Sequence, residues 1–216
     1  MQSTTTAGVA DYICLNSAAI IDNLNQESID VYNFLKKEFL QSDVTTNYVF
    51  QFVYRSYYRL DNAGLTPRFK SEYFKIMQEE RNKANQDLKG VLKRLYAFQN
   101  LRNQDNFQFS FVTKLFNTID NNLPIYDSEV ARVFGYCWPY QNDFDIKYNK
   151  LKEQLEFITE AYNAIISEDF VKPATDLFDA KFPNHQLSDM KRLDFIVWSA
   201  GKIMAGQTVK PVRRKR

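Results

Sequence analysis

The chain has few of the residues that build the commonest catalytic centres. Its 216 residues include two cysteines, Cys14 and Cys137, and one histidine, His185. Two cysteines are too few for a disulfide framework, and we expect both to be reduced, buried thiols. A single histidine excludes a histidine-rich metal site, and a Ser-His-Asp triad would have to use His185, which lies in a surface-turn sequence, FPNHQL. A site made only of carboxylates stays open, but we assign no metal and no cofactor.

Glycine and proline are also scarce, with six of each, which indicates few irregular connections. The chain lacks an apolar run long enough to cross a bilayer and lacks a secretory signal, so we expect a cytoplasmic, intracellular protein with no membrane partner. No P-loop or dinucleotide fingerprint occurs. The length and the 44% hydrophobic content fit one helical domain over residues 9–206, between a flexible N-terminus (1–8) and a basic tail (207–216).

Apolar periodicity predicts an all-α fold of about nine or ten helices. Thr66 and Pro67 mark one helix start, since Thr is a good N-cap and Pro suits the first helical position. The alternating aromatics of residues 48–54 are also compatible with a strand, but residues 55–60 continue better as helix, so we predict helix there. The other clearly bounded helices are expected at residues 9–24, 28–40, 67–80, 86–98, 143–167 and 174–182.

The most informative stretch is residues 107–136, FQFSFVTKLFNTIDNNLPIYDSEVARVFGY. Its apolar residues recur at helical spacing up to Ile119, and the polar residues and proline of positions 120–124 then end this helix. Asp127 follows as the expected N-cap of a second helix, with Glu129 also near the positive helix end. We expect that helix to end at Gly135.

This arrangement resembles the core of the helix-hairpin-helix DNA glycosylase superfamily, and the phrase TKLFNTIDNNLPIYDSEVARVFG carries the resemblance. The resemblance implies a fold of that type and a function in excising a modified base from double-stranded DNA, in repair or in defence against modified DNA. It also implies that Asp127 is the catalytic carboxylate, which would stabilise the cationic sugar or orient the attacking water while a nucleotide is held outside the duplex.

The same resemblance implies a DNA-binding face and a pocket for the extruded base. The expected DNA contacts are basic and polar residues near the hairpin and the second helix: Arg102, Asn103, Gln104, Asn106, Lys114 and Arg132. Arg94 is a further candidate for this face. Aromatic residues on either side of the second helix could stack on the base: Tyr126, Tyr136 and Trp138. The alternative for the aromatic cluster after Gly135 is a packed lid over the core.

Two departures from the family pattern support a second hypothesis. Bifunctional members carry a nucleophilic lysine in the hairpin region, where this chain has Gln108, Phe109 and Ser110. The hairpin usually carries a Gly-x-Gly turn, and residues 101–106 contain no glycine. The first hypothesis is therefore a monofunctional glycosylase. The second is a non-catalytic helical DNA-binding or protein-interaction module, in which Asp127 is only a helix cap.

The net charge of +2 is unevenly distributed, because five positive charges lie in the last seven residues: Lys210, Arg213, Arg214, Lys215 and Arg216. The rest of the chain is not basic, so a DNA-binding face would need local clustering. The tail could add non-specific phosphate contacts that weaken with salt, or it could be solvated without a partner.

Overall fold

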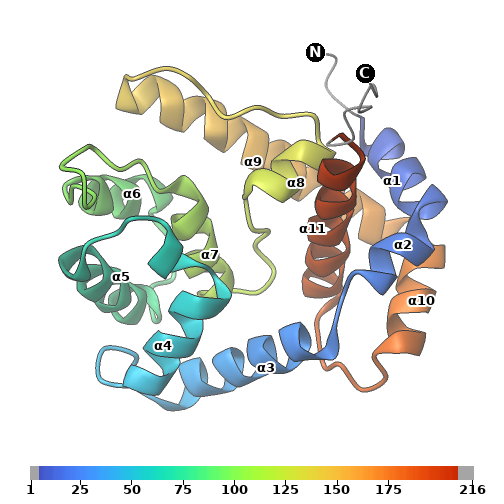
Figure 1. Ribbon diagram of the computed structural model, residues 1–216, viewed down its shortest axis with the longest axis horizontal. Helices are drawn as coiled ribbons and strands as arrows, with labels where there is room; N and C mark the ends of the chain where they lie inside the picture. The colour runs from blue at the N-terminus through green and yellow to red at the C-terminus, as the bar shows by residue number, and fades with distance from the viewer. Residues whose placement is uncertain (1–4, 209–216) are drawn as a thin grey trace, which may run out of the picture. The chain divides into compact units, whose positions relative to one another are not determined.

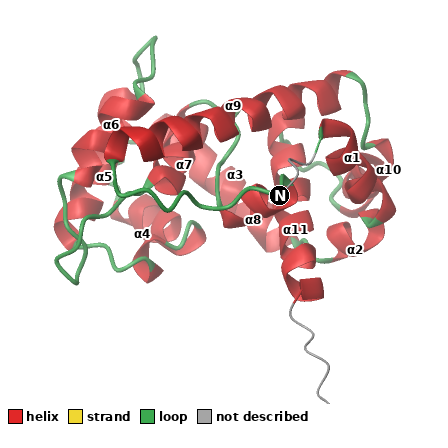
Figure 2. Cartoon of the chain, turned by 90° about the horizontal axis from the view of Figure 1, so that it is seen from above, coloured by secondary structure: helices red, strands yellow, loops and turns green. Residues whose placement is uncertain are grey.

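The computed structural model describes residues 5–208, and within them the chain forms eleven α-helices, one 3-10 helix and no strand (Figure 2). The predicted all-α fold is confirmed. Helix α1 already begins at Thr6, inside the segment expected to be flexible, and most of the basic tail lies outside the described residues. Among the described helices, none combines the length and the apolar character that crossing a bilayer requires.

The helices group into two compact units. The continuous unit runs from Gln26 to Tyr126, and the discontinuous unit joins the N-terminal segment up to Asn25 to the chain from Asp127 onward. The single domain over residues 9–206 stays a prediction. Asp127 is the first residue of the second part of the discontinuous unit.

The continuous unit is built on an aromatic core. Tyr54, Tyr73 and Phe74 are buried, and the Tyr54 and Tyr73 hydroxyl groups lie 2.9 Å apart in a hydrogen bond. The Tyr73 hydroxyl also donates to the Phe111 carbonyl at 2.8 Å, so the buried polar groups of these rings are satisfied. Its helices are α3 (Gln26–Gln41), α4 (Tyr48–Tyr57), η1 (Leu60–Asn62), α5 (Pro67–Glu80), α6 (Leu88–Tyr96) and α7 (Phe109–Ile119).

The discontinuous unit is arranged around its last helix, α11, which contacts α1, α2, α8, α9 and α10 (Figure 1). Ile196, Val197 and Ala200 of α11 are fully buried in this core. The helices of the unit are α1 (Thr6–Leu15), α2 (Ser17–Asp22), α8 (Ser128–Val133), α9 (Phe144–Ser167), α10 (Lys172–Lys181) and α11 (Asp189–Thr208).

Local sequence signals account for most helix starts. Helix α5 has the predicted bounds, and the Thr66 hydroxyl accepts a hydrogen bond from the Phe69 amide at 3.2 Å. The segment from Tyr48 is helical, as predicted, and not a strand. The helix expected at residues 9–24 is instead two helices, because the chain leaves helical geometry at Asn16 (φ −114°, ψ 14°), whose side-chain amide donates to the Tyr12 carbonyl.

Both cysteines are free, but the expectation that both are buried was wrong. Cys14 is half-buried, and its thiol donates to the Phe170 carbonyl at 3.3 Å. Burial and the nearby Asp11 carboxylate raise the pKa of Cys14. Cys137 is exposed, because it lies in the irregular segment after α8 and not on a helix face.

Candidate active site

Asp127 caps α8, as the sequence predicts. Its backbone is extended, and Oδ1 of its half-buried side chain accepts hydrogen bonds from the amides of Glu129 at 2.9 Å and Val130 at 3.0 Å. Both bonds use Oδ1, so Oδ2 is not part of the cap. Two amide bonds to one oxygen fix the orientation of the whole carboxylate, so the other oxygen also has a defined direction.

Helix α8 is held closely against α11 (Figure 1). A Cβ atom on Gly201 of α11 would lie only 2.2 Å from the Glu129 carbonyl oxygen, so only glycine permits this approach. Arg132 reinforces the contact, since it pairs with the Glu129 carboxylate and donates to the Gly201 carbonyl at 3.2 Å. The position of the Asp127 cap therefore depends on the contact between α8 and α11.

The discontinuous unit also contains a group of buried polar side chains. The Lys191 ammonium and the Asp194 carboxylate of α11 form an ion pair at 2.7 Å, and both side chains are almost fully buried. Tyr162 of α9 is fully buried, and its hydroxyl has no hydrogen-bond partner among the described residues. Burial, with the negative charges of Asp194 and Asp127, raises the pKa of Tyr162 well above its ordinary value. The Tyr162 hydroxyl therefore stays protonated at neutral pH, and the negative charges of Asp194 and Asp127 disfavour its ionised form.

The aromatic segment after α8 divides into a packed part and an exposed part. Gly135 adopts φ 69° and ends the helix, and the Tyr136 amide donates to the Ala131 carbonyl at 2.8 Å. The half-buried Tyr136 ring stacks on Phe134 with centroids 6.4 Å apart. Trp138 is 48% exposed. Tyr136 therefore contributes mainly to packing, whereas Trp138 offers an accessible ring.

Tyr126, the third aromatic residue expected in a base pocket, lies in the core of the continuous unit. It is 1% exposed, and its ring packs edge-on against Phe109 with centroids 5.4 Å apart. Its amide donates to the Thr113 hydroxyl at 3.0 Å, which ties the segment before Asp127 to α7. Its role in stacking on a base stays a prediction.

The polar loop between α6 and α7 is a compact turn. The Asn100 side-chain oxygen accepts from the amides of Arg102 at 2.8 Å and Gln104 at 3.1 Å. Asn103 adopts φ 57°, so an asparagine takes the left-handed conformation for which glycine is usual. The Leu101 amide donates to the Gly64 carbonyl at 2.9 Å and fixes the loop to the turn before α5. The loop thus exposes the expected DNA-contact residues Arg102, Asn103 and Gln104.

The other expected DNA contacts are less accessible. Asn106 is 7% exposed, and its side-chain oxygen accepts a hydrogen bond from Gln108. The half-buried Lys114 ammonium lies 5.1 Å from the centre of the Phe111 ring. Arg94 pairs with Glu72 at 2.6 Å and with Glu79 at 2.5 Å, and Arg132 pairs with Glu129 as described above. Of the four cations expected to contribute to a DNA-binding face, Arg102 is the exposed one without such a partner among the described residues.

Sequence reasoning missed three features of the unit that contains Asp127: the close approach at Gly201, the buried Tyr162 hydroxyl and the buried Lys191–Asp194 pair. A glycine inside an apolar helical pattern such as that of α11 usually has a packing reason, and this signal could have identified Gly201. Lys191 and Asp194 are three residues apart on one helix, a spacing that is much commoner for exposed pairs. Among the described residues, no three Asp, Glu, His or Cys side chains are grouped so that they could hold a metal ion.

The predicted residues fall in both units. Asp127, Arg132, Tyr136 and Trp138 belong to the discontinuous unit, and the remaining six belong to the continuous unit. Comparison of the chain with models of protein families, with curated proteins and with solved structures found no match. The resemblance to the glycosylase superfamily therefore stays a prediction from residues 107–136.

Proposed function

We propose that this chain is a DNA-binding protein of the glycosylase type, which releases a modified base by hydrolysis of its N-glycosidic bond with Asp127 as the catalytic carboxylate. The observation that carries the proposal is the geometry of Asp127. One carboxylate oxygen is committed to two backbone amides, and the other is not part of the cap.

The chemistry needs a carboxylate at a fixed place. When the bond between the base and the sugar breaks, positive charge develops on the sugar. A carboxylate that is already oriented stabilises this charge without reorganising during the reaction. The same oxygen can instead orient the water that attacks the sugar. The contact of α8 with Gly201 and the bond from Arg132 to the Gly201 carbonyl hold Asp127 in place for either role.

DNA binding would use the loop between α6 and α7. Arg102 is exposed there, and the hydrogen bonds of Asn100 fix the loop backbone. A fixed loop with an exposed arginine is suited to a phosphate contact, which positions a duplex without reading its sequence. Asn103 supports this assignment, because its left-handed backbone replaces the glycine that the family pattern has in such a turn.

A second candidate function is a helical DNA-binding or protein-interaction module without catalysis. The pairing of Arg94 and Arg132 with carboxylates favours the protein-interaction form of this module, since two of the cations expected to contact DNA are neutralised within the fold. The absence of a lysine at positions 108–110 fits either function.

The experiment that separates the two functions is a screen for released bases. Purified full-length protein is incubated with genomic DNA and with duplexes that carry oxidised, deaminated or alkylated bases, and the small-molecule fraction is analysed by mass spectrometry. The glycosylase proposal predicts release of one class of base and abasic sites in the remaining DNA. Binding of duplex DNA without release from any substrate would contradict it and favour the module.

A further inference from the structure

The arginines of the continuous unit divide into two groups. The members of the first group have partners within the fold: Arg55 pairs with Asp61 at 3.2 Å, Arg94 pairs with Glu72 at 2.6 Å, and Arg81 donates to the Ser42 carbonyl at 2.9 Å. The members of the second group are exposed, and no hydrogen bond or ion pair joins their side chains to another residue that the structure describes: Arg59, Arg68 and Arg102. Their N–H donors are therefore available to an external anion.

Contacts between two segments bring the second group together. The Leu101 amide donates to the Gly64 carbonyl at 2.9 Å, which joins the loop that carries Arg102 to the turn between Arg59 and Arg68. The Arg68 guanidinium lies 5.9 Å from the centre of the Phe98 ring and forms a second link between the same segments. A guanidinium placed over a ring keeps its N–H groups, which lie in its own plane, available to an anion. We call Arg59, Arg68 and Arg102 the arginine surface.

The backbone on both sides of the arginine surface is held in place. Arg59 adopts the left-handed conformation, with φ 60°, and its carbonyl accepts the Asn62 amide at 3.2 Å. In the other segment, Asn103 is left-handed and the Asn100 side chain holds two amides of the loop. A backbone that is already ordered lowers the entropy cost of binding an extended partner.

The neighbouring charges favour an anion most clearly at Arg68, which lies in the first turn of α5 at the positive helix end. The Asp61 carboxylate in the turn before α5 is neutralised by ion pairs with both Arg55 and Lys70. Asp105 leaves one negative charge in the loop, and its carboxylate accepts the Tyr96 hydroxyl at 3.3 Å. Arg59 follows the C-terminal end of α4, so part of its charge offsets that helix end.

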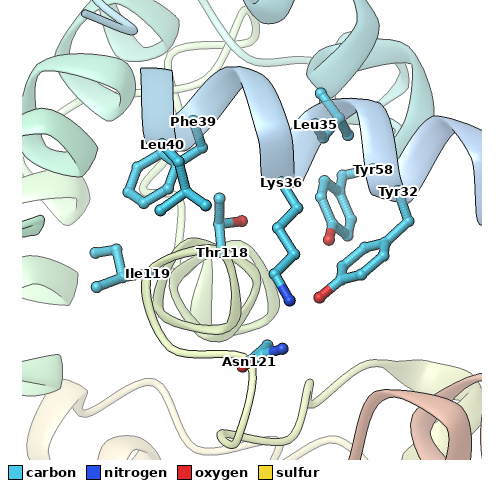
Figure 3. Close-up of a pocket in the computed structure, with 9 residues that line it drawn as sticks. All are labelled: Tyr32, Leu35, Lys36, Phe39, Leu40, Tyr58, Thr118, Ile119 and Asn121. Atoms are coloured by element: carbon cyan, nitrogen blue, oxygen red, sulfur yellow. The ribbon is translucent and has the colours of Figure 1, made fainter. Parts of the chain in front are cut away.

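The pocket of the continuous unit shown in Figure 3 offers no comparable site. Lys36 is the charged residue of its lining, and the pocket lies at the C-terminal ends of α3 and α7, whose carbonyls disfavour an anion. The arginine surface is open and carries several cations, so it is suited to an extended polyanion and not to a small enclosed one.

We propose that the arginine surface binds the sugar-phosphate backbone of duplex DNA, with Arg68 contacting a phosphate in addition to Arg102. Guanidinium groups match phosphate oxygens with paired N–H donors, and a duplex presents phosphates at regular intervals to cations on separate segments. The inference rests on the proposed function, in which Arg102 is the phosphate contact, and it adds the turn between α4 and α5 to the DNA-binding face. It depends neither on Asp127 nor on base release.

The test measures binding of a short labelled duplex without modified bases to the full-length protein, by fluorescence anisotropy at about 50 to 200 mM salt. Each cation that contacts a phosphate contributes about 0.9 to the slope of log affinity against log salt. We expect Arg68→Gln to reduce this slope by that amount and to weaken binding about tenfold at the lower salt concentration. Arg68→Lys keeps the charge and should keep the wild-type slope.

Lys37→Gln is the matched control, because it removes one exposed positive charge from α3 of the same unit. Its slope should equal that of wild type. The basic tail is identical in all these proteins, so its contribution cancels in the comparison.

Three outcomes would overturn the inference: absence of duplex binding, equal slopes for wild type and a folded Arg68→Gln, or equal losses in Arg68→Gln and Lys37→Gln. Displacement of the duplex by polyglutamate at the same concentration of charge would identify an acidic protein segment as the partner and would also overturn it. The predicted slopes together with no base release from any substrate would refute the glycosylase function alone.

Discussion

Replacing Gly201 by alanine should disturb the site without changing any group that could do chemistry. The new Cβ would lie 2.2 Å from the Glu129 carbonyl oxygen and 2.8 Å from the Glu129 Cα, and these are backbone atoms that cannot rotate away. An ordinary contact needs at least 3.4 Å, so α8 and α11 must separate by about 1 Å. The Asp127 cap lies at the start of α8 and should move with this helix.

The magnitude follows from two opposing effects. Overpacking against backbone costs about 3 kcal/mol, and the better helix propensity of alanine returns about 1 kcal/mol. We therefore expect Gly201→Ala to lower the free energy of unfolding by about 2 kcal/mol, or the melting temperature by roughly 4–8 °C for a chain of this size. A displacement of about 1 Å would also reduce base release on the order of 100-fold, if Asp127 is catalytic.

Gly206 on the same helix is the matched control. A Cβ there has no neighbour within 4 Å, so Gly206→Ala should leave base release unchanged and should raise the free energy of unfolding by at most about 1 kcal/mol. Urea unfolding followed by circular dichroism measures both variants. The reasoning fails if Gly201→Ala is as stable as Gly206→Ala, because α8 would then not be held by this close approach.

Two further predictions concern charged residues. Lys191→Met should lower the free energy of unfolding by about 3–5 kcal/mol, because the Asp194 carboxylate then stays buried without its ion-pair partner. The double variant Lys191→Met/Asp194→Leu should recover most of this loss, as measured by urea unfolding. Additive losses from the two substitutions would refute the pairing. The hydrogen bond from Arg94 holds the pKa of Glu79 below its ordinary value of 4.5, so the stabilisation by this pair is present above that pH and is lost as the pH falls through the lowered pKa. Glu79→Gln should therefore cost at most about 1 kcal/mol of unfolding free energy near neutral pH and nothing in acid, and a cost that stayed constant with pH would contradict this assignment.

The parts of the fold that the sequence predicted are those set by local rules. Helix α5 follows from Thr66 and Pro67, whose capping and fixed φ act within a few residues. The start and end of α8 follow equally from Asp127 and Gly135. The break at Asn16 was not predictable in this way, because the sequence around it is apolar and periodic on both sides, and only the observed backbone shows that α1 and α2 are separate.

The site was predictable only in part, for the same reason. The Asp127 cap and the exposure of Arg102 depend on nearby residues. The burial of Lys191 and Asp194 depends on helices that are distant in the sequence, and a charged pair at this spacing would be expected on the surface. Arg132 was expected to contact DNA, and its pairing with Glu129 and the Gly201 carbonyl depends on the packing of α8 on α11.

The most direct test of the account compares base release by wild type, Asp127→Asn and Asp143→Asn, on the substrate found in the screen. Asparagine caps helices about as well as aspartate, so both variants should unfold at nearly the wild-type urea concentration. Asp143 caps α9 through a 2.8 Å bond from the Ile146 amide and serves as a cap outside the proposed chemistry. We predict that Asp127→Asn loses base release by about 100-fold or more while Asp143→Asn keeps it. Equal release by wild type and a folded Asp127→Asn would show that Asp127 is only a helix cap.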